Sequence, residues 1–315
     1  MKRIFELTHG DIMTMSREEL LKAIKASEGR TIMAETVISV QPLIYGVSNP
    51  ETAAAFGADM ITLNAFDFEY PFIFGIDNID LYLSKGHQVL EDINKRIKEN
   101  KSNPNYIRNA RSIIGRFLGV NLEPVPEDTN YPEGRKLNED NLKRAAVLGF
   151  DYVVITGNPN TGVTAGTVLK GIDTAAGILK DKVIIIAGKM HGAGKENIYN
   201  PSILKDFVKA GADVVMIPAP GTVPGMDTSL TKRQIETIHE EGALAMTAMG
   251  TSQEGSEERV IEQFALMSKM AGADIQHIGD AGYAGMAFPE NIMKLSVTIR
   301  GKRHTYRRMA YSARK

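Results

Sequence analysis

A lysine and a histidine stand two residues apart at the end of a short apolar run, in DKVIIIAGKMHGAG at residues 181–194. A β-branched run of this length, bounded by glycine, is typical of a parallel strand buried on both faces. A lysine at the end of such a strand is partly desolvated, which favours the neutral amine and suits a general base or a Schiff-base nucleophile. For Lys189 the alternatives are anion binding or an ion pair with a glutamate. His191 adds a group that moves protons near neutral pH.

The strand before Lys189 belongs to a repeating pattern. A glycine, a small or aromatic residue, an aspartate and an apolar strand follow one another four times, in FGADMITLN, LGFDYVVITGN, AGADVVMIPAP and AGADIQHIGD. From the second copy on, the copies are about 60 residues apart, which is twice the ~30 residues of one βα unit. Further strands fit the intervals, in RFLGVNLEP, DKVIIIAGK and GALAMTAMG. Together with residues 31–38, these segments predict a closed (β/α)8 TIM barrel that forms a single α/β domain over residues 1–315.

Helix signals add elements around this barrel. Ser16 and Glu19 have the spacing of a capping box and predict an N-terminal helix. Asn49 and Pro50 are expected as the N-cap and first residue of the helix after the first strand. Residues 65–112 form an insertion after the second strand, with aromatic residues at alternate positions from 66 to 74. This insertion is expected either as a lid over the barrel mouth or as an aromatic patch buried under its own helix or at a subunit contact.

The alternation of side chains along each strand predicts which residues point into the barrel. On the strands of the four repeats, the polar-bearing face is expected to line the interior, and Gln276 does not fit this rule. On the other strands the charged set is placed inward, and it includes Lys189 and His191. All of these side chains lie near the carboxyl ends of their strands, where enzymes of this fold have their sites. The remaining inward residues are Glu35, Asn64, Asn121, Glu123, Thr156, Thr247 and His277.

These residue types suit proton transfer around a carbonyl carbon, as in enolisation, isomerisation or carbon–carbon cleavage. Four of them, Lys189, His191, Glu35 and Glu123, are the catalytic candidates. The candidates for binding and orienting the substrate are Asn64, Asn121, Thr156, Asn158 and His277. The cofactor is unassigned, and Mg²⁺ or Mn²⁺ is the alternative occupant. Its candidate ligands are Glu35, Glu123, Asp280 and His191, although no tight ligand spacing such as HExxH occurs.

The glycine-rich loops after the last two strands are expected to bind phosphate. Many barrels hold phosphate at this position through backbone N–H groups and a helix N-terminus. Asp280 is unfavourable beside a phosphate unless it points away or binds a metal, and ordinary turn formation is the alternative role of these loops. The residues expected to bind phosphate are Gly250, Thr251, Ser252, Gly279 and Gly282.

Composition narrows the class of protein. Lys and Arg number 37 against 38 Asp and Glu, a formal net charge of −1, so no global field attracts nucleic acid or an anionic membrane. The chain has no cysteine, which removes disulfides and thiolate chemistry. Without an apolar signal segment or membrane span, the protein is expected in the cytoplasm. The basic stretch from Arg300 is expected to be solvated or to contact another subunit of a homo-oligomer.

The whole pattern of GAD-strand repeats and late glycine-rich turns resembles the ribulose-phosphate-binding class of barrels. The phrases VNLEP, TGNPNTG, AGKMHGAGK and IGDAGYAG are similar to an uncharacterised bacterial barrel family, whose members carry the labels phosphoenolpyruvate phosphonomutase-like or haloacid-dehalogenase-like. A haloacid dehalogenase needs a DxDx[TV] loop, and this chain has none. The phosphonomutase-like group has a gating segment with a cysteine and an aspartate cluster, whereas this chain has no cysteine and has Asn64 where acids are expected.

The sequence therefore predicts an enzyme that acts on a small phosphorylated carbonyl or sugar compound by isomerase or lyase chemistry. A non-catalytic barrel that binds a metabolite or serves in assembly is one alternative. A metal-dependent hydrolase is the other.

Overall fold

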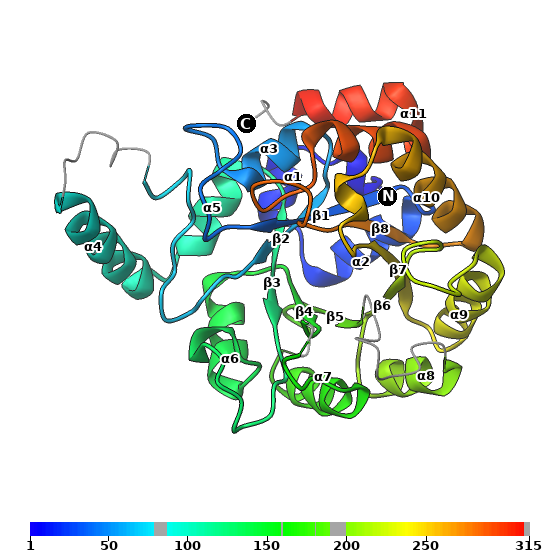
Figure 1. Cartoon of the computed structure of the whole chain (residues 1–315), viewed down its shortest axis with the longest axis horizontal. Coiled ribbons are helices and arrows are strands. Elements are labelled where there is room, and N and C mark those ends of the chain that lie inside the picture. The colour runs from blue at the N-terminus through cyan, green and yellow to red at the C-terminus, as the bar shows by residue number, and fades with distance from the viewer. Residues whose placement is uncertain (79–86, 159, 180, 190–199, 312–315) are drawn as a thin grey trace.

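The computed structural model describes residues 1–78, 87–158, 160–179, 181–189 and 200–311. Eight parallel strands pair in chain order and close into a barrel, with helices around it (Figure 1). The predicted (β/α)8 barrel is therefore confirmed. The strands are β1 Thr31–Val37, β2 Met60–Asn64, β3 Phe117–Leu122, β4 Tyr152–Ile155, β5 Ile184–Gly188, β6 Val214–Pro218, β7 Leu244–Met249 and β8 Ile275–Ile278.

The helices follow the strands in alternation after a short amino-terminal group. None of the helices in the described ranges has both the length and the apolar composition that a membrane span requires. The helices are α1 His9–Thr14, α2 Arg17–Ala26, α3 Asn49–Ala55, α4 Gln88–Ser102, α5 Tyr106–Ile114, α6 Glu139–Leu148, α7 Ala165–Leu179, α8 Pro201–Lys209, α9 Thr228–Glu240, α10 Glu258–Ala271 and α11 Pro289–Tyr311.

Two helix starts test the capping predictions. Ser16 is the N-cap of α2 and accepts from the backbone N–H of Glu19, as predicted. The N-cap of α3 is Ser48 rather than Asn49, because Ser48 forms a capping box with Glu51. The Asn49 side chain instead joins loops, and its Nδ2 donates to the carbonyl of Ala284, 2.7 Å away.

The two faces of the strands pack into two separate hydrophobic cores. The inner core fills the barrel, and it is closed at the amino-terminal end by side chains of the first segment, including Ile4, Phe5 and Leu7. The outer core lies between the strands and the helices. In the middle of the barrel Gly119 leaves room for Tyr152, because a Cβ at Gly119 would lie 2.0 Å from that ring.

The predicted inward faces of β5 and β7 are wrong. Ile184 and Ile186 pack in the inner core, so Lys189 follows the alternation of the helix-facing Ile185 and Ala187 rather than the inward set. On β7, Met246 and Ala248 face inward, which turns Thr247 toward the helices. The physical reason is that β5 is apolar on both faces, whereas β7 buries its one polar residue, Thr247, on the helix-facing side, so a polar side chain does not mark the inward face of either strand.

The aspartate of each repeat has a shared structural role at the amino-terminal end of the barrel. Each carboxylate accepts the N–H of the second residue of the preceding strand in the barrel, at 2.8–2.9 Å, for example from Ile32 to Asp59. In every case, the aspartate's own N–H donates back to that same residue's carbonyl. The four pairs of strand residue and aspartate are Ile32 with Asp59, Leu118 with Asp151, Ile185 with Asp213, and Ala245 with Asp274.

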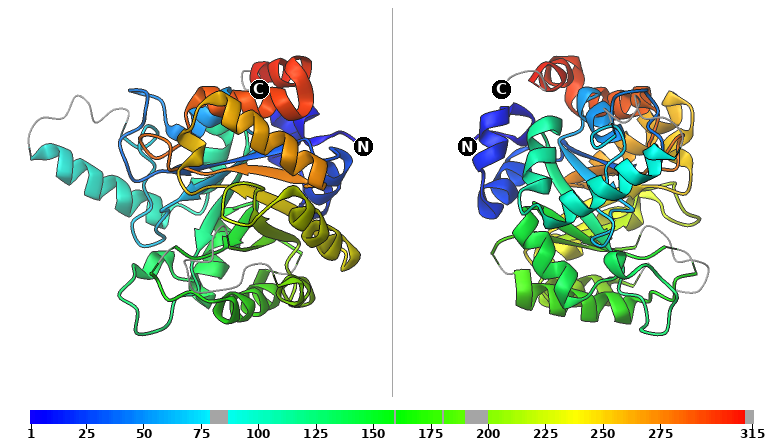
Figure 2. Two further views of the ribbon diagram at one scale, coloured as in Figure 1. Left: turned by 45° about the vertical axis from the view of Figure 1, so that its right-hand side comes forward. Right: turned by 90° about the vertical axis from the view of Figure 1, so that its left-hand side faces the viewer.

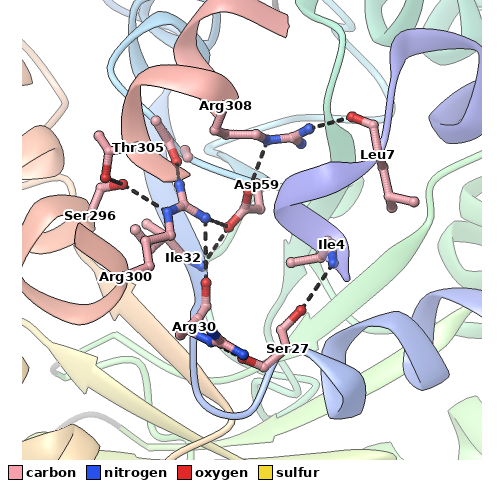
Figure 3. A network of polar contacts seen from close by, with 12 residues as sticks. Ile4, Leu7, Ser27, Arg30, Ile32, Asp59, Ser296, Arg300, Thr305 and Arg308 are labelled. Atoms are coloured by element: carbon pink, nitrogen blue, oxygen red, sulfur yellow. Dashed lines mark hydrogen bonds and ion pairs between the residues drawn. The ribbon is translucent and has the colours of Figure 1, made fainter. Parts of the chain in front are cut away.

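Asp59 also anchors the last helix of the chain (Figure 3). Arg300 Nη1 lies 2.6 Å from Asp59 Oδ2, and Arg308 Nε lies 2.8 Å from Oδ1, with all three side chains fully buried. Arg308 also donates to the carbonyl of Leu7. The two arginines flank Gly301, where the α11 backbone leaves helical geometry. The prediction of a solvated or subunit-contacting basic end is therefore wrong for Arg300 and Arg308.

The described part of the insertion packs its aromatic residues internally. Phe66 and Phe68 are buried and contact Phe150 edge-on, and Phe66 stacks on Tyr106 of α5. Phe66 and Phe68 are therefore part of the interior of the molecule, and a lid role for the insertion stays a prediction. Helix α4 extends away from the barrel (Figures 1 and 2), and residues 79–86 lie outside the described ranges.

Candidate functional site

A row of hydrogen-bonded side chains crosses the carboxyl ends of three neighbouring strands and the loop after β8. Asn121 Nδ2 donates to Glu35 Oε1 and also to Asn64 Oδ1, the latter over 3.2 Å. Asn64 Nδ2 donates to Asp280 Oδ2 over 2.6 Å. The order Glu35–Asn121–Asn64–Asp280 thus links two carboxyl groups through two amides. The amides fix the direction of each carboxyl, as a site for directed proton transfer requires.

His277 reaches the same row from β8. Its Nε2 lies 3.3 Å from Glu35 Oε2, and both side chains are buried. Beneath the row is a cavity of about 10 Å³, whose polar lining comes from Glu35, Thr62, Asn121, Thr156 and His277. The structure therefore brings together five residues that the sequence predicts at the site: Glu35, Asn64, Asn121, Thr156 and His277.

A further carboxylate enters from the loop after β7. Glu254 lies in the short helix η4 Gln253–Gly255 and is 2% exposed. Its Oε1 accepts the N–H of Ala281 at 3.0 Å. A Cβ at Gly279 would lie 2.6 Å from Glu254 Oε1, so the glycine makes room for the carboxylate. Sequence reasoning missed Glu254, although its position close behind the polar loop at Gly250–Ser252 was a usable signal.

Burial and mutual repulsion shift the protonation of these carboxyls. Burial and the nearby charge of Glu35 raise the pKa of Asp280 to about 7, against the lowering effect of the Asn64 hydrogen bond. Burial also raises the pKa of Glu254. Asp280 therefore retains its proton over part of the neutral range and is able to donate it.

Glu123 serves a different set of contacts. Its Oε1 accepts from the Tyr131 hydroxyl at 2.6 Å and from Asn158 Nδ2, and its Oε2 accepts the backbone N–H of Asn158. Glu123 is 2% exposed and joins the loops after β3 and β4. Glu123 and Asn158 therefore form their own pair and do not line the cavity beneath Glu35.

Lys189 lies one residue beyond β5. Its ammonium donates to the carbonyl of Val163 at 3.0 Å, in the loop that leads into α7. Lys189 does not line the cavity beneath Glu35. His191, the second residue of the predicted pair, lies outside the described residues. A catalytic role for either residue stays a prediction.

The residues expected to bind phosphate are partly engaged in the fold. The N–H of Gly250 donates to the Thr222 hydroxyl, and the N–H of Gly279 donates to the carbonyl of Met249. Thr251 and Ser252 both have left-handed backbone, and the Thr251 hydroxyl donates to the carbonyl of Thr222. Two of the predicted amide donors are therefore already used, and Glu254 brings negative charge to Gly279.

The candidate metal ligands are separated. Within the described ranges, no three histidine, aspartate or glutamate side chains gather closely enough to hold a metal ion. Glu123 is held by Tyr131 and Asn158, away from the row that contains Glu35 and Asp280. The three predicted oxygen ligands thus do not form one ligand set.

Comparisons with known proteins give a family and a fold. A family model described as Domain of unknown function (DUF7916) matches residues 5–315. No curated protein matches the sequence.

Solved structures resemble the chain at low identity. One is 2,3-dimethylmalate lyase, a PEP mutase/isocitrate lyase superfamily member, at 14% identity and a TM-score of 0.50, covering 86% of this chain and 80% of that chain. Another is thiamine phosphate pyrophosphorylase from Pyrococcus furiosus, at 12% identity and a TM-score of 0.47, covering 86% of this chain and 96% of that chain. The carboxyl transferase domain of Rhizobium etli pyruvate carboxylase matches at 12% and 0.48, covering 96% of this chain and 51% of that chain. At these identities the likeness concerns the fold alone.

Proposed function

The chain belongs to the DUF7916 family, and we propose that it is an enzyme that moves protons on a small carbonyl or sugar compound, by isomerase or lyase chemistry. The observation that carries this proposal is the row Glu35–Asn121–Asn64–Asp280 at the carboxyl end of the barrel. Two carboxyl groups held in fixed directions, one with a raised pKa, are the arrangement that acid–base catalysis needs.

The roles follow from the environment of each group. Glu35 is proposed as the base, because it is buried and oriented by both Asn121 and His277. Asp280 is proposed as the acid, because its pKa of about 7 keeps it partly protonated at neutral pH. Asn64 and Asn121 position the two carboxyls, and their amides also suit hydrogen bonds to substrate hydroxyls. Enolisation needs a base that removes a proton beside a carbonyl and an acid that protonates the oxygen or the neighbouring carbon.

The experiment measures proton exchange directly. The protein is incubated in D₂O with a panel of aldoses, ketoses and 2-oxo acids, and loss of carbon-bound proton signals is followed by NMR. We expect exchange with at least one compound, and a fall of roughly 100- to 10,000-fold in Glu35→Gln and Asp280→Asn. The exposed variant Glu139→Gln should exchange at the parent rate.

Two results count against the proposal. Parent rates in Glu35→Gln would remove the assigned base. Ligands that stabilise the protein but never exchange a proton would favour a metabolite-binding barrel without catalysis.

A further inference from the structure

A mainly polar pocket of about 190 Å³ lies at the amino-terminal end of the barrel, the end opposite the row of Glu35 and Asp280. Four segments of the chain meet around it: the link between α1 and α2, helix α5, the end of α6 with the turn into β4, and the turn into β5. One acidic side chain, Asp151, lines this pocket together with four basic ones. The basic residues are Arg17, Arg108, Arg111 and Lys182.

Two of the basic side chains are held in place by carboxylates. Arg111 pairs with Asp151, and Arg17 pairs with Asp213. Each aspartate also accepts a backbone N–H from a strand of the barrel, so the carboxylates are fixed and in turn fix the guanidinium groups. These two positive charges are therefore rigidly placed and already compensated.

The other two basic side chains have no acidic partner among the described residues. Nη1 of Arg108 donates to the carbonyls of Pro104 and Val147, at 3.0 and 2.9 Å, which orients the guanidinium without neutralising it. Gly149 leaves room for this side chain, because a Cβ there would lie 3.0 Å from Arg108 Nε. Lys182 is exposed, and its ammonium forms no ion pair within the described ranges. The pocket therefore has two positive charges beyond those that its arginines share with aspartates.

This excess of positive charge is a local property. A second groove at the same end of the barrel, of about 540 Å³, is lined by two lysines and one histidine against four acidic residues. The whole chain has a formal net charge of −1. Cations gathered around one concave site repel one another and attract an anion.

We propose that this pocket binds the phosphate group of a small metabolite, with Arg108 and Lys182 as the residues that supply the uncompensated charge. A phosphate monoester has a charge of about −1.5 to −2 at pH 7 and three strong acceptor oxygens. That charge matches the two cations, and guanidinium and ammonium groups are the usual donors to phosphate oxygens. The volume of about 190 Å³ is roughly ten or more times what one water molecule needs, so a phosphate with a short carbon chain fits.

The position of the pocket indicates what binding would do. The site is remote from the acid–base row, so the ligand is an effector or a stabilising anion rather than the substrate. The segments around the pocket come together only in the folded chain, so a ligand that joins them stabilises the native state.

The first test is equilibrium binding to the whole wild-type chain. Inorganic phosphate and glycerol 3-phosphate are compared with glycerol and succinate by calorimetry and thermal unfolding, with sodium chloride holding the ionic strength constant. We expect both phosphates to bind with dissociation constants below about 1 mM and to raise the melting temperature, and glycerol to do neither.

Three results of this test would overturn the proposal. The first is no binding of either phosphate up to about 10 mM. The second is an equal rise in melting temperature from sodium chloride at the same ionic strength, which would show screening alone. The third is tighter binding of succinate than of glycerol 3-phosphate, which would assign the pocket to dicarboxylates.

The second test removes the two uncompensated charges one at a time. We expect Arg108→Gln and Lys182→Gln each to raise the dissociation constant for glycerol 3-phosphate roughly tenfold, the value of one hydrogen bond to a charged group. Arg233→Gln removes the same charge from an exposed arginine on α9 that does not line the pocket, and should leave the constant unchanged.

Both replaced side chains are exposed, so the variants should fold, and if Arg108→Gln does not, Lys182→Gln decides. Parent affinity in both variants would mean that phosphate binds elsewhere, for example at the glycine-rich loops of the mouth, and would overturn the proposal. This inference does not rest on the proposed function. Failure of proton exchange would leave the pocket unaffected, and failure of phosphate binding would leave the acid–base row unaffected.

Discussion

At the amino-terminal end of the barrel, the four repeats place an aspartate in the same position four times, with the same pair of backbone hydrogen bonds. At the carboxyl end the same four strands lead to unlike residues, among them Asn64, Thr156, Pro218 and His277. Closing the barrel needs the same strand geometry at each repeat, so the same residue with the same hydrogen bonds can be used each time. A binding site needs different groups around one ligand, so the repeats differ there.

The partners of the four aspartates also differ. Asp151 and Asp213 each pair with one arginine, Arg111 and Arg17, and Asp274 pairs with His239. Asp59 alone among them pairs with two fully buried arginines in the described structure. At the amino-terminal end, the contact of Asp59 with its two arginines is therefore expected to contribute most to stability. Three variants test the contrast between the two ends of the barrel.

The largest expected effect is at Asp59. Asp59→Asn leaves Arg300 and Arg308 buried without their counter-charge, which should cost about 3–5 kcal/mol in the free energy of unfolding. The measurement is urea unfolding at constant pH. Asp274→Asn is the matched control, because its partner His239 is partly exposed, and about 1 kcal/mol or less is expected. Similar losses in both variants would show that the backbone hydrogen bonds, which Asp59 and Asp274 share, set the cost and that the buried arginines add little.

A variant at the carboxyl end should raise the free energy of unfolding rather than lower it. The pKa of Asp280 is raised from 3.8 to about 7, so its contribution to stability is full below pH ~4 and is lost as the pH rises through 7. Asp280→Asn removes a charge that opposes folding at pH 8 and should stabilise the protein there by about 1–2 kcal/mol, after allowance for partial exposure.

Unfolding measured at pH 4 and pH 8 checks this prediction, with little difference from the parent expected at pH 4. A loss of stability at pH 8 would mean that the hydrogen bond from Asn64 outweighs the burial of charge. Gain of stability with loss of proton exchange is the expected signature of a group retained for chemistry.

The smallest expected effect is at His239. Its hydrogen bond to Asp274, 2.7 Å long, raises the pKa of the imidazole. The stabilisation is therefore present below pH ~6.5 and is lost as the pH rises through the raised value. His239→Gln should lower the melting temperature at pH 6 by the equivalent of less than about 1 kcal/mol, and should match the parent at pH 9. An equal difference at both pH values would assign the contact to packing alone.

Alternation along the strands gave the right interior residues where one face is polar. Glu35, Asn121 and His277 follow it, and they meet at the mouth as expected. Lys189 and Thr247 do not, because β5 is apolar on both faces and the one polar residue of β7, Thr247, faces the helices. The repeats were visible as glycine and aspartate, but the aspartate's bond to the neighbouring strand depends on the closed barrel.

The carboxylate cluster was harder to foresee. The sequence predicts Asp280 only as a metal ligand or as unfavourable beside phosphate, not as an acid. Glu254 enters from a loop whose path no local pattern sets. Arg300 and Arg308 resemble a solvated basic stretch along the chain, and only the return of α11 to Asp59 buries them. These positions depend on contacts between segments far apart in the sequence, which local sequence patterns do not predict.

The contacts of α11 also bear on the order of folding. The bond from Arg300 to Asp59 closes a loop of 241 residues, and that from Arg308 to Leu7 spans 301. Figure 2 shows the amino-terminal segment beside the end of α11. Closing such long loops costs conformational entropy before the contact forms, so we expect these bonds to form late in folding and to be weak in the transition state. Interactions of that kind slow unfolding more than they speed folding. We therefore expect the buried arginine pair to act mainly by lowering the unfolding rate of the closed barrel.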